Sequence, residues 1–133
     1  MKFRSVFASY PEIELAFQYG SSVKKSLRKA KDVDIALLLK KIPSVERRLD
    51  IQSGIADLLT KKFKKPVDAV LLNRASPFLA HQVIKYGKLL FGKKSRARDF
   101  IVKTLTRYFD VLLFHRFFLE RLEKRLGVQS DDR

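Results

Sequence analysis

The chain alternates short apolar runs with longer segments whose apolar residues recur every three or four positions. Apolar runs bounded by turn residues predict strands, and the three-or-four spacing predicts amphipathic helices. Predicted strands cover 13–19, 32–39, 67–72 and 88–91. Predicted helices cover 3–10, 21–29, 45–63, a segment that starts between 73 and 77 and ends near 87, and 95–126. Strands separated by helices imply a sheet covered by helices, an α/β or α+β layer structure built around one core.

Two of these helices carry more detailed expectations. Ser21 and Ser22 are predicted to cap the basic helix at 21–29, because serine side chains accept hydrogen bonds from free N–H groups at a helix start. In the helix at 45–63, one side is expected to hold five apolar residues: Val45, Leu49, Ile55, Leu58 and Leu59.

The last helix, at 95–126, is followed by a polar tail at 127–133. Steps of four and three, the heptad spacing of a helix-packing seam, relate Ile101, Leu105, Tyr108, Leu112, His115, Leu119, Leu122 and Leu126. The stripe is widened by Phe109, Leu113, Phe117 and Phe118. Either this helix closes the core, or part of the stripe binds a second chain in a homo- or hetero-oligomer. We therefore expect a domain at 1–92 and a segment at 93–133 that packs on the domain or on a partner.

Lys and Arg number 29 against 14 Asp and Glu, which gives a net charge of +15 and favours anionic partners. Nucleic acid is a possible partner, through basic stretches at 61–65, 93–98 and 121–125, but we favour solvated faces for these lysines and arginines. The absence of cysteine excludes disulfides, thiolate zinc sites and a cysteine nucleophile. Since no run of about 18 apolar residues occurs, no membrane partner is expected. A cytoplasmic location fits both observations.

The residues that indicate chemistry are Gly20-Ser21, then ten residues, then Asp32-Val33-Asp34, and Asp68 in a separate predicted strand. Residues two apart in a strand point to the same face, so three carboxylates converge if the two strands are neighbours. Their mutual repulsion is relieved by a cation, and hard oxygen ligands select Mg²⁺ or Mn²⁺. Two such ions serve phosphoryl or nucleotidyl transfer.

The turn at Gly20, Ser21 and Ser22 is a candidate cradle for the nucleotide phosphates. Glycine allows close backbone approach, and free N–H groups at a helix start favour phosphate. A purely structural interpretation stays open, with Asp32 in a turn, Asp34 as a solvent-facing edge residue, Asp68 as an acid at a strand start and Gly20-Ser21 as an ordinary helix cap. His81 and His115 lie far apart in the sequence and are expected to be structural.

These residues resemble the minimal nucleotidyltransferase (MNT) domains of the DNA polymerase beta superfamily, whose signature is Gly-Ser, a spacer, Asp-x-Asp and a later strand Asp. The stretches LLNRASPFL at 71–79 and GKLLF at 87–91 look like the family's continuation, so the likeness covers about 12–92. With its C-terminal helix, the chain is similar to the antitoxins of HEPN–MNT toxin–antitoxin pairs. The resemblance implies a nucleotidyltransferase fold, with a small mixed sheet covered by helices and a long C-terminal helix.

The resemblance also implies roles for these residues. Asp32 and Asp34 bind metal, Asp68 completes the site and helps activate the acceptor, and Gly20-Ser21 holds the triphosphate of ATP. In the antitoxin branch, the enzyme transfers AMP to a tyrosine of a partner HEPN ribonuclease and so silences it. Two alternatives stay open: a weakly active or inactive protein that neutralises its partner by docking, and a nucleotidyltransferase that acts on a small molecule or an RNA end.

Overall fold

A mixed sheet lies at the centre of the computed structural model, which describes residues 3–25 and 28–128. Its strands are β1 (Ile13–Tyr19), β2 (Val33–Leu39), β3 (Val67–Leu71) and β4 (Lys88–Phe91), in the order β3-β2-β1-β4. β1 is antiparallel to β2 and β4, whereas β2 and β3 are parallel. The prediction of a small mixed sheet is confirmed, and each predicted strand agrees with the observed one to within a residue at either end.

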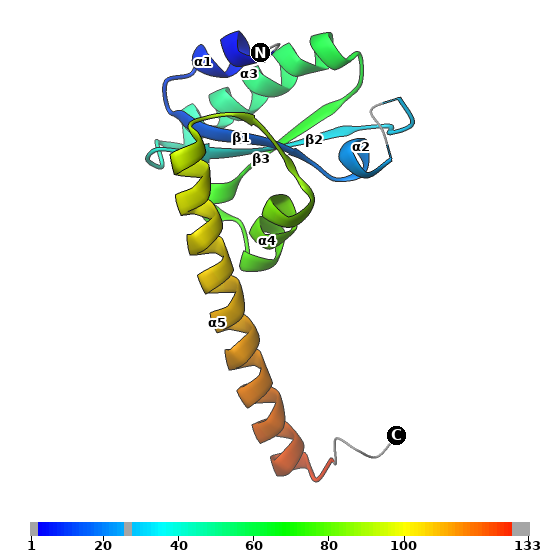
Figure 1. The fold of residues 1–133 in the computed structure, drawn as a ribbon, viewed down its shortest axis with the longest axis vertical. Helices are drawn as coiled ribbons and strands as arrows, with labels where there is room; N and C mark the ends of the chain where they lie inside the picture. The colour runs from blue at the N-terminus through cyan, green and yellow to red at the C-terminus, as the bar shows by residue number, and fades with distance from the viewer. Residues whose placement is uncertain (1–2, 26–27, 129–133) are drawn as a thin grey trace.

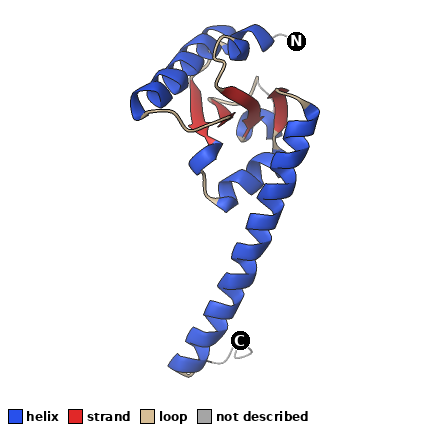
Figure 2. Ribbon diagram, turned by 90° about the vertical axis from the view of Figure 1, so that its left-hand side faces the viewer, coloured by secondary structure: helices blue, strands red, loops and turns tan. Residues whose placement is uncertain are grey.

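Helices cover both faces of this sheet (Figures 1 and 2). They are α1 (Arg4–Ala8), α2 (Ser21–Lys24), α3 (Val45–Phe63), the 3₁₀ turn η1 (Leu72–Arg74), α4 (Pro77–Tyr86) and α5 (Lys94–Leu126). One apolar cluster joins the sheet to α1 and α3, and a second joins its other face to α4 and the start of α5. The fold is therefore helix, sheet and helix in three layers.

α3 starts where Ser44 accepts a hydrogen bond from the N–H of Arg47 at 3.2 Å, and its bounds match the prediction. The predicted apolar side is wrong in part. Of the five predicted residues, Ile55 and Leu59 are buried, Val45 and Leu49 are about 60% exposed, and Leu58 is 38% exposed. Ile51, which was not among them, is buried as well. The helix meets the sheet through this one narrow stripe, and its first turn extends past the edge of the core.

The predicted helix at 21–29 is shorter in the structure. α2 ends at Lys24, and residues 26–27 lie outside the described part of the chain. Gly20 occupies the N-cap position, and no side-chain cap bond is made there. The serines therefore follow the cap rather than form it.

α5 divides into a packed part and a free part. Ala97 and Thr104 are buried, and the ring of His81 on α4 stacks on Tyr108 at 3.7 Å between centroids. Beyond this contact the helix projects away from the domain, as Figure 1 shows, and Phe114 and Phe117 are 71% and 63% exposed. The core-closing interpretation holds for the first part of the helix only.

The two histidines have different surroundings. His81 is structural, as expected, because its ring joins α4 to α5. His115 is exposed on the free part of α5 and takes no part in the core. Among the helices of residues 3–25 and 28–128, none combines the length and the apolar character needed to cross a membrane.

Candidate active site

Three polar side chains from three neighbouring strands form a row across the sheet. Tyr19 pairs with Asp34 in the antiparallel register of β1 and β2, and Asp34 pairs with Asp68 in the parallel register of β2 and β3. Paired residues project from the same face of a sheet, and neighbouring strands lie about 4.8 Å apart. Asp32 comes two residues before Asp34, just outside β2, and is exposed. The condition for the carboxylates to lie together, that β2 and β3 are neighbouring strands, is therefore met.

The carboxylates in this row influence one another. The pKa of Asp34 is raised, first by burial and then by the negative charges of Asp68 and Asp32. Burial, together with Asp34 and Asp68, raises the pKa of the Tyr19 hydroxyl to about 12. Neighbouring negative charges oppose the ionisation of each of these groups, and together they attract a cation. Tyr19 was not anticipated from the sequence, although its place directly before Gly20 was a usable signal.

The glycine of the turn touches the acid of β2. Gly20 has φ +78° and ψ −154°, a backbone conformation that is open to glycine and strained for other residues. A Cβ atom at this position would overlap a carboxylate oxygen of Asp34. The turn and the carboxylate therefore pack directly against each other. The backbone of Gly20 can for this reason come close to a ligand held by Asp34.

The two serines of the turn have different surroundings. Ser22 is buried, and its hydroxyl accepts a hydrogen bond from the side-chain amide of Gln18 at 2.9 Å. Ser21, the first residue of α2, is partly exposed. Further along, the ammonium of Lys24 lies over the ring of Tyr86 at 4.7 Å from its centroid. Ser22 thus supports the turn from inside, and Ser21 is the more exposed of the two serines.

A lysine in the turn between α3 and β3 holds the loop that carries Asp32. The ammonium of Lys65 donates to the carbonyl oxygens of Ala30 at 2.6 Å and Arg28 at 3.1 Å. The N–H of Val33 donates to the carbonyl of Pro66 at 2.9 Å. Lys65 had been expected on a solvated basic face, and its structural role depends on a contact across more than thirty residues.

The donor chemistry of this site fits a hard divalent cation. Asp32, Asp34 and Asp68 supply carboxylate oxygens, the ligands that Mg²⁺ prefers. Burial, and then the charges of Asp68 and Asp32, raise the pKa of Asp34, and a bound cation would oppose this shift. In the described part of the chain, no three His, Cys, Asp or Glu side chains are grouped closely enough to hold a metal ion as they stand. The three carboxylates would therefore have to move closer together to hold one ion jointly.

Comparisons with known proteins agree with this geometry. The family described as Polymerase beta, Nucleotidyltransferase matches residues 1–96. The protein adenylyltransferase MntA of Shewanella oneidensis is 31% identical over 98 residues, which is 74% of this chain and 68% of that protein.

Solved structures with a similar fold include chains of toxin–antitoxin complexes. A chain of the MntA–HepT toxin–antitoxin crystal structure is similar with a TM-score of 0.64 and 25% identity, over 86% of this chain and 87% of that one. A chain in the structure of tri-AMPylated Shewanella oneidensis HEPN toxin in complex with MNT antitoxin has a TM-score of 0.65, with the same identity and coverage.

Proposed function

The chain belongs to the polymerase beta nucleotidyltransferase family, and on that premise we propose that it is an Mg²⁺-dependent protein adenylyltransferase and an antitoxin. It transfers AMP from ATP to a tyrosine of a partner HEPN toxin and so neutralises the toxin. The observation that carries this proposal is the row of Asp34 and Asp68 beside the turn at Gly20. The named relatives, an adenylyltransferase and an AMPylated toxin complex, support the choice of AMP and of a protein acceptor. A cytoplasmic location, where ATP is abundant, belongs to this proposal.

The carboxylates would act as ligands and as a base. Asp32 and Asp34 are proposed to hold the Mg²⁺ ions, with Asp68 completing the site. Two ions, when bound, activate the attacking oxygen and neutralise charge on the leaving phosphates. The Asp68 carboxylate accepts the proton of the acceptor hydroxyl, whose oxygen bonds to the α-phosphorus while the bond to pyrophosphate breaks.

The turn after β1 would hold the phosphates. The conformation of Gly20 brings backbone close to Asp34, and the partly exposed Ser21 begins a helix whose first N–H groups have no intrahelical acceptor. Ser22 would act indirectly, because its hydroxyl is engaged by Gln18 and fixes the shape of the turn. We therefore assign phosphate contact to Gly20 and Ser21, and support of the turn to Ser22.

The free part of α5 is proposed as the surface that docks the toxin. Its exposed large apolar residues are Phe109, Leu112, Leu113, Phe114, Phe117, Phe118, Leu119 and Leu126. Surfaces of this kind on a protein are typical of binding sites for another chain. We propose that residues 1–92 form the catalytic domain and that 93–133 anchor on it through the first part of α5 and reach the partner through the rest.

This exposed surface also favours one second candidate: neutralisation by docking alone. A labelling experiment separates the two. Native host lysate is incubated with Mg²⁺, ATP labelled at the α- or the γ-phosphate, and purified wild-type or Asp32→Asn protein. We expect one protein band labelled only from the α-position and only by the wild type. A partner that co-purifies with both proteins and stays unlabelled would instead establish docking, and label in RNA or in small molecules would identify a different acceptor.

A further inference from the structure

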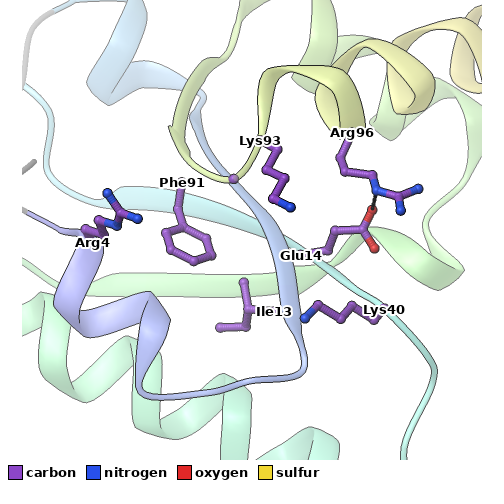
Figure 3. A pocket seen from close by; sticks show the side chains of 8 residues that line it. Arg4, Ile13, Glu14, Lys40, Phe91, Lys93 and Arg96 are labelled. Carbon is purple, nitrogen blue, oxygen red and sulfur yellow. Dashed lines mark ion pairs between the residues drawn. The ribbon is translucent and has the colours of Figure 1, made fainter.

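A cavity lies at the opposite end of the sheet from the carboxylates. It is a cavity of about 700 Å³ between α1, the start of β1, the residue after β2 and the start of α5 (Figure 3). β1 runs from Ile13 at this cavity to Tyr19 in the acidic row, a rise of about 20 Å at 3.3 Å per residue. A ligand in the cavity is therefore separate from a nucleotide at the carboxylates.

Cations from separate parts of the chain converge on this cavity. Arg4, Lys40, Lys93 and Arg96 line it together with one acid, Glu14, so four positive charges face one negative charge. Figure 3 shows the ammonium groups of Lys40 and Lys93 directed toward its middle. Arg96 lies 3.9 Å from Glu14, and the other three cations have no ion-pair partner among the described residues. All four side chains are exposed, so they reach the cavity from its rim and together give it a local excess of positive charge that attracts an anion.

The backbone adds to this positive field. α5, 33 residues long, starts at the cavity with Lys93 as its N-cap, and it has neither a side-chain cap bond nor an acid in its first turn. The free N–H groups and the dipole of a long helix favour an anion at that end. Gly92, at φ +121°, turns the chain from β4 into this helix next to Leu15. The N-terminal end of α5 and the cationic side chains thus lie at the same cavity.

We propose that this cavity binds the phosphate groups of a nucleotide, either free or at the 5′ end of a strand. Its volume lies in the range of about 300–1,000 Å³ that small-ligand sites occupy, and the ring of Phe91 forms part of its wall. Arginine and lysine side chains with free backbone N–H groups are the usual partners of phosphate. A ligand held here contacts α1, the residue after β2 and the first turn of α5, which lies in the packed part of that helix.

The test measures nucleotide binding in EDTA, where metal-dependent binding at the carboxylates is suppressed. The probes are ATP, AMP, pyrophosphate and an oligonucleotide with or without a 5′ phosphate. Isothermal titration calorimetry measures the binding of each probe. The pocket variant is Lys40→Ala with Lys93→Ala. The matched control, Lys124→Ala with Arg125→Ala, removes the same charge from the far end of α5. Circular dichroism melts check that all proteins are folded.

We expect one saturable site in the wild type, weakened about tenfold or more in the pocket variant and nearly unchanged in the control. Mg²⁺-dependent transfer persists in the pocket variant, so failure of this proposal is distinguishable from failure of the proposed function. Free nucleotides that compete with the 5′-phosphorylated strand, but not with its unphosphorylated form, would identify the shared group. Absence of saturable binding, equal losses in both variants, or equal binding of the oligonucleotide with and without its 5′ phosphate together with no binding of free nucleotides would overturn the proposal.

Discussion

At the scale of single residues, Gly20 is the position with the least tolerance for change. In Gly20→Ala the new methyl group meets the Asp34 carboxylate and also strains a backbone at φ +78°. We expect nucleotide transfer to fall at least about 100-fold, because the phosphate turn and the metal ligand are displaced together. Steady-state kinetics of AMP transfer measure the loss.

Gly127→Ala is the matched control for this change. Gly127 also has a positive φ, +74°, but a Cβ atom there meets nothing within 4 Å. Strain alone costs about 1 kcal/mol and leaves transfer intact. Equal activity losses in the two variants would show that contact with Asp34 is irrelevant.

Asp34 carries a second prediction at this scale. Its raised pKa means that the folded protein binds this proton more tightly than the unfolded chain does. Without metal, the contribution of Asp34 to stability therefore falls as pH rises from its ordinary pKa through the raised one. Asp34→Asn removes this penalty, so at neutral pH the free energy of unfolding of the metal-free variant is higher by less than about 1 kcal/mol, and its melting temperature rises slightly. Transfer is abolished.

Thermal melts in EDTA across that pH range check this prediction, with Asp57→Asn on the exposed side of α3 as the control. A metal-free Asp34→Asn protein that is less stable than the wild type would contradict it. In the wild type, transfer increases as pH rises through the pKa of Asp34, because metal binding needs the carboxylate ionised.

Period-two spacing predicted that Asp32 and Asp34 share a face, but it left their approach to Asp68 conditional on the two strands being neighbours. Asp32 and Asp34 are two positions apart, and a parallel neighbour places Asp68 beside them. Lys65 could not be predicted, since its carbonyl partners lie 35 and 37 residues earlier in the chain. The inward turn of Ser22 likewise depends on Gln18, which no local pattern distinguishes.

At the scale of elements, the free part of α5 is expected to determine partner affinity. Phe114 and Phe118 stack at 6.4 Å between centroids and are 71% and 54% exposed. Replacing both with aspartate should raise the dissociation constant of the toxin complex about 30-fold or more without changing the melting temperature of the chain. Biolayer interferometry with the purified toxin measures the change.

Val45→Asp serves as the control for these substitutions, because Val45 is 59% exposed but lies on α3. Unchanged affinity in the aspartate pair would remove α5 from the interface. Loss of affinity with Val45→Asp as well would indicate a general effect of added negative charge.

Asn73 joins two elements and gives a stability prediction. Its side chain accepts from the N–H of Leu39 and donates to the carbonyl of Leu39, both at 2.8 Å, and so fixes η1 to the end of β2. Asn73→Ala leaves both partly buried groups unpaired and should lower the free energy of unfolding by about 1–3 kcal/mol. Urea unfolding tests this, with the exposed Ser53→Ala expected to cost less than about 0.5 kcal/mol.

Element types and bounds were largely predictable from the sequence, but the faces that the elements bury were not. The bounds of α3 follow from Ser44 and the residues after Phe63, whereas its buried stripe is set by the width of the sheet that it covers. The heptad spacing of α5 is continuous, yet only its first part meets the domain. Periodicity identifies an apolar face and does not say what covers it.

At the scale of the whole molecule, the two ends of the sheet have opposite character. The acidic row lies at one end, and a cavity lined by Arg4, Lys40, Lys93 and Arg96 lies at the other. The net charge of +15 indicated anionic partners without locating them. The cavity is assembled from segments far apart in the chain, so only the fold reveals it.

The central claim is that this chain modifies its partner covalently at the acidic row. The most direct measurement is mass spectrometry of the purified HEPN toxin after incubation with ATP, Mg²⁺ and either wild-type or Asp34→Asn protein. The account predicts that the wild type adds one or more AMP units to a toxin tyrosine and that the variant adds none. An unmodified toxin that is nevertheless inactivated equally well by both proteins would contradict it.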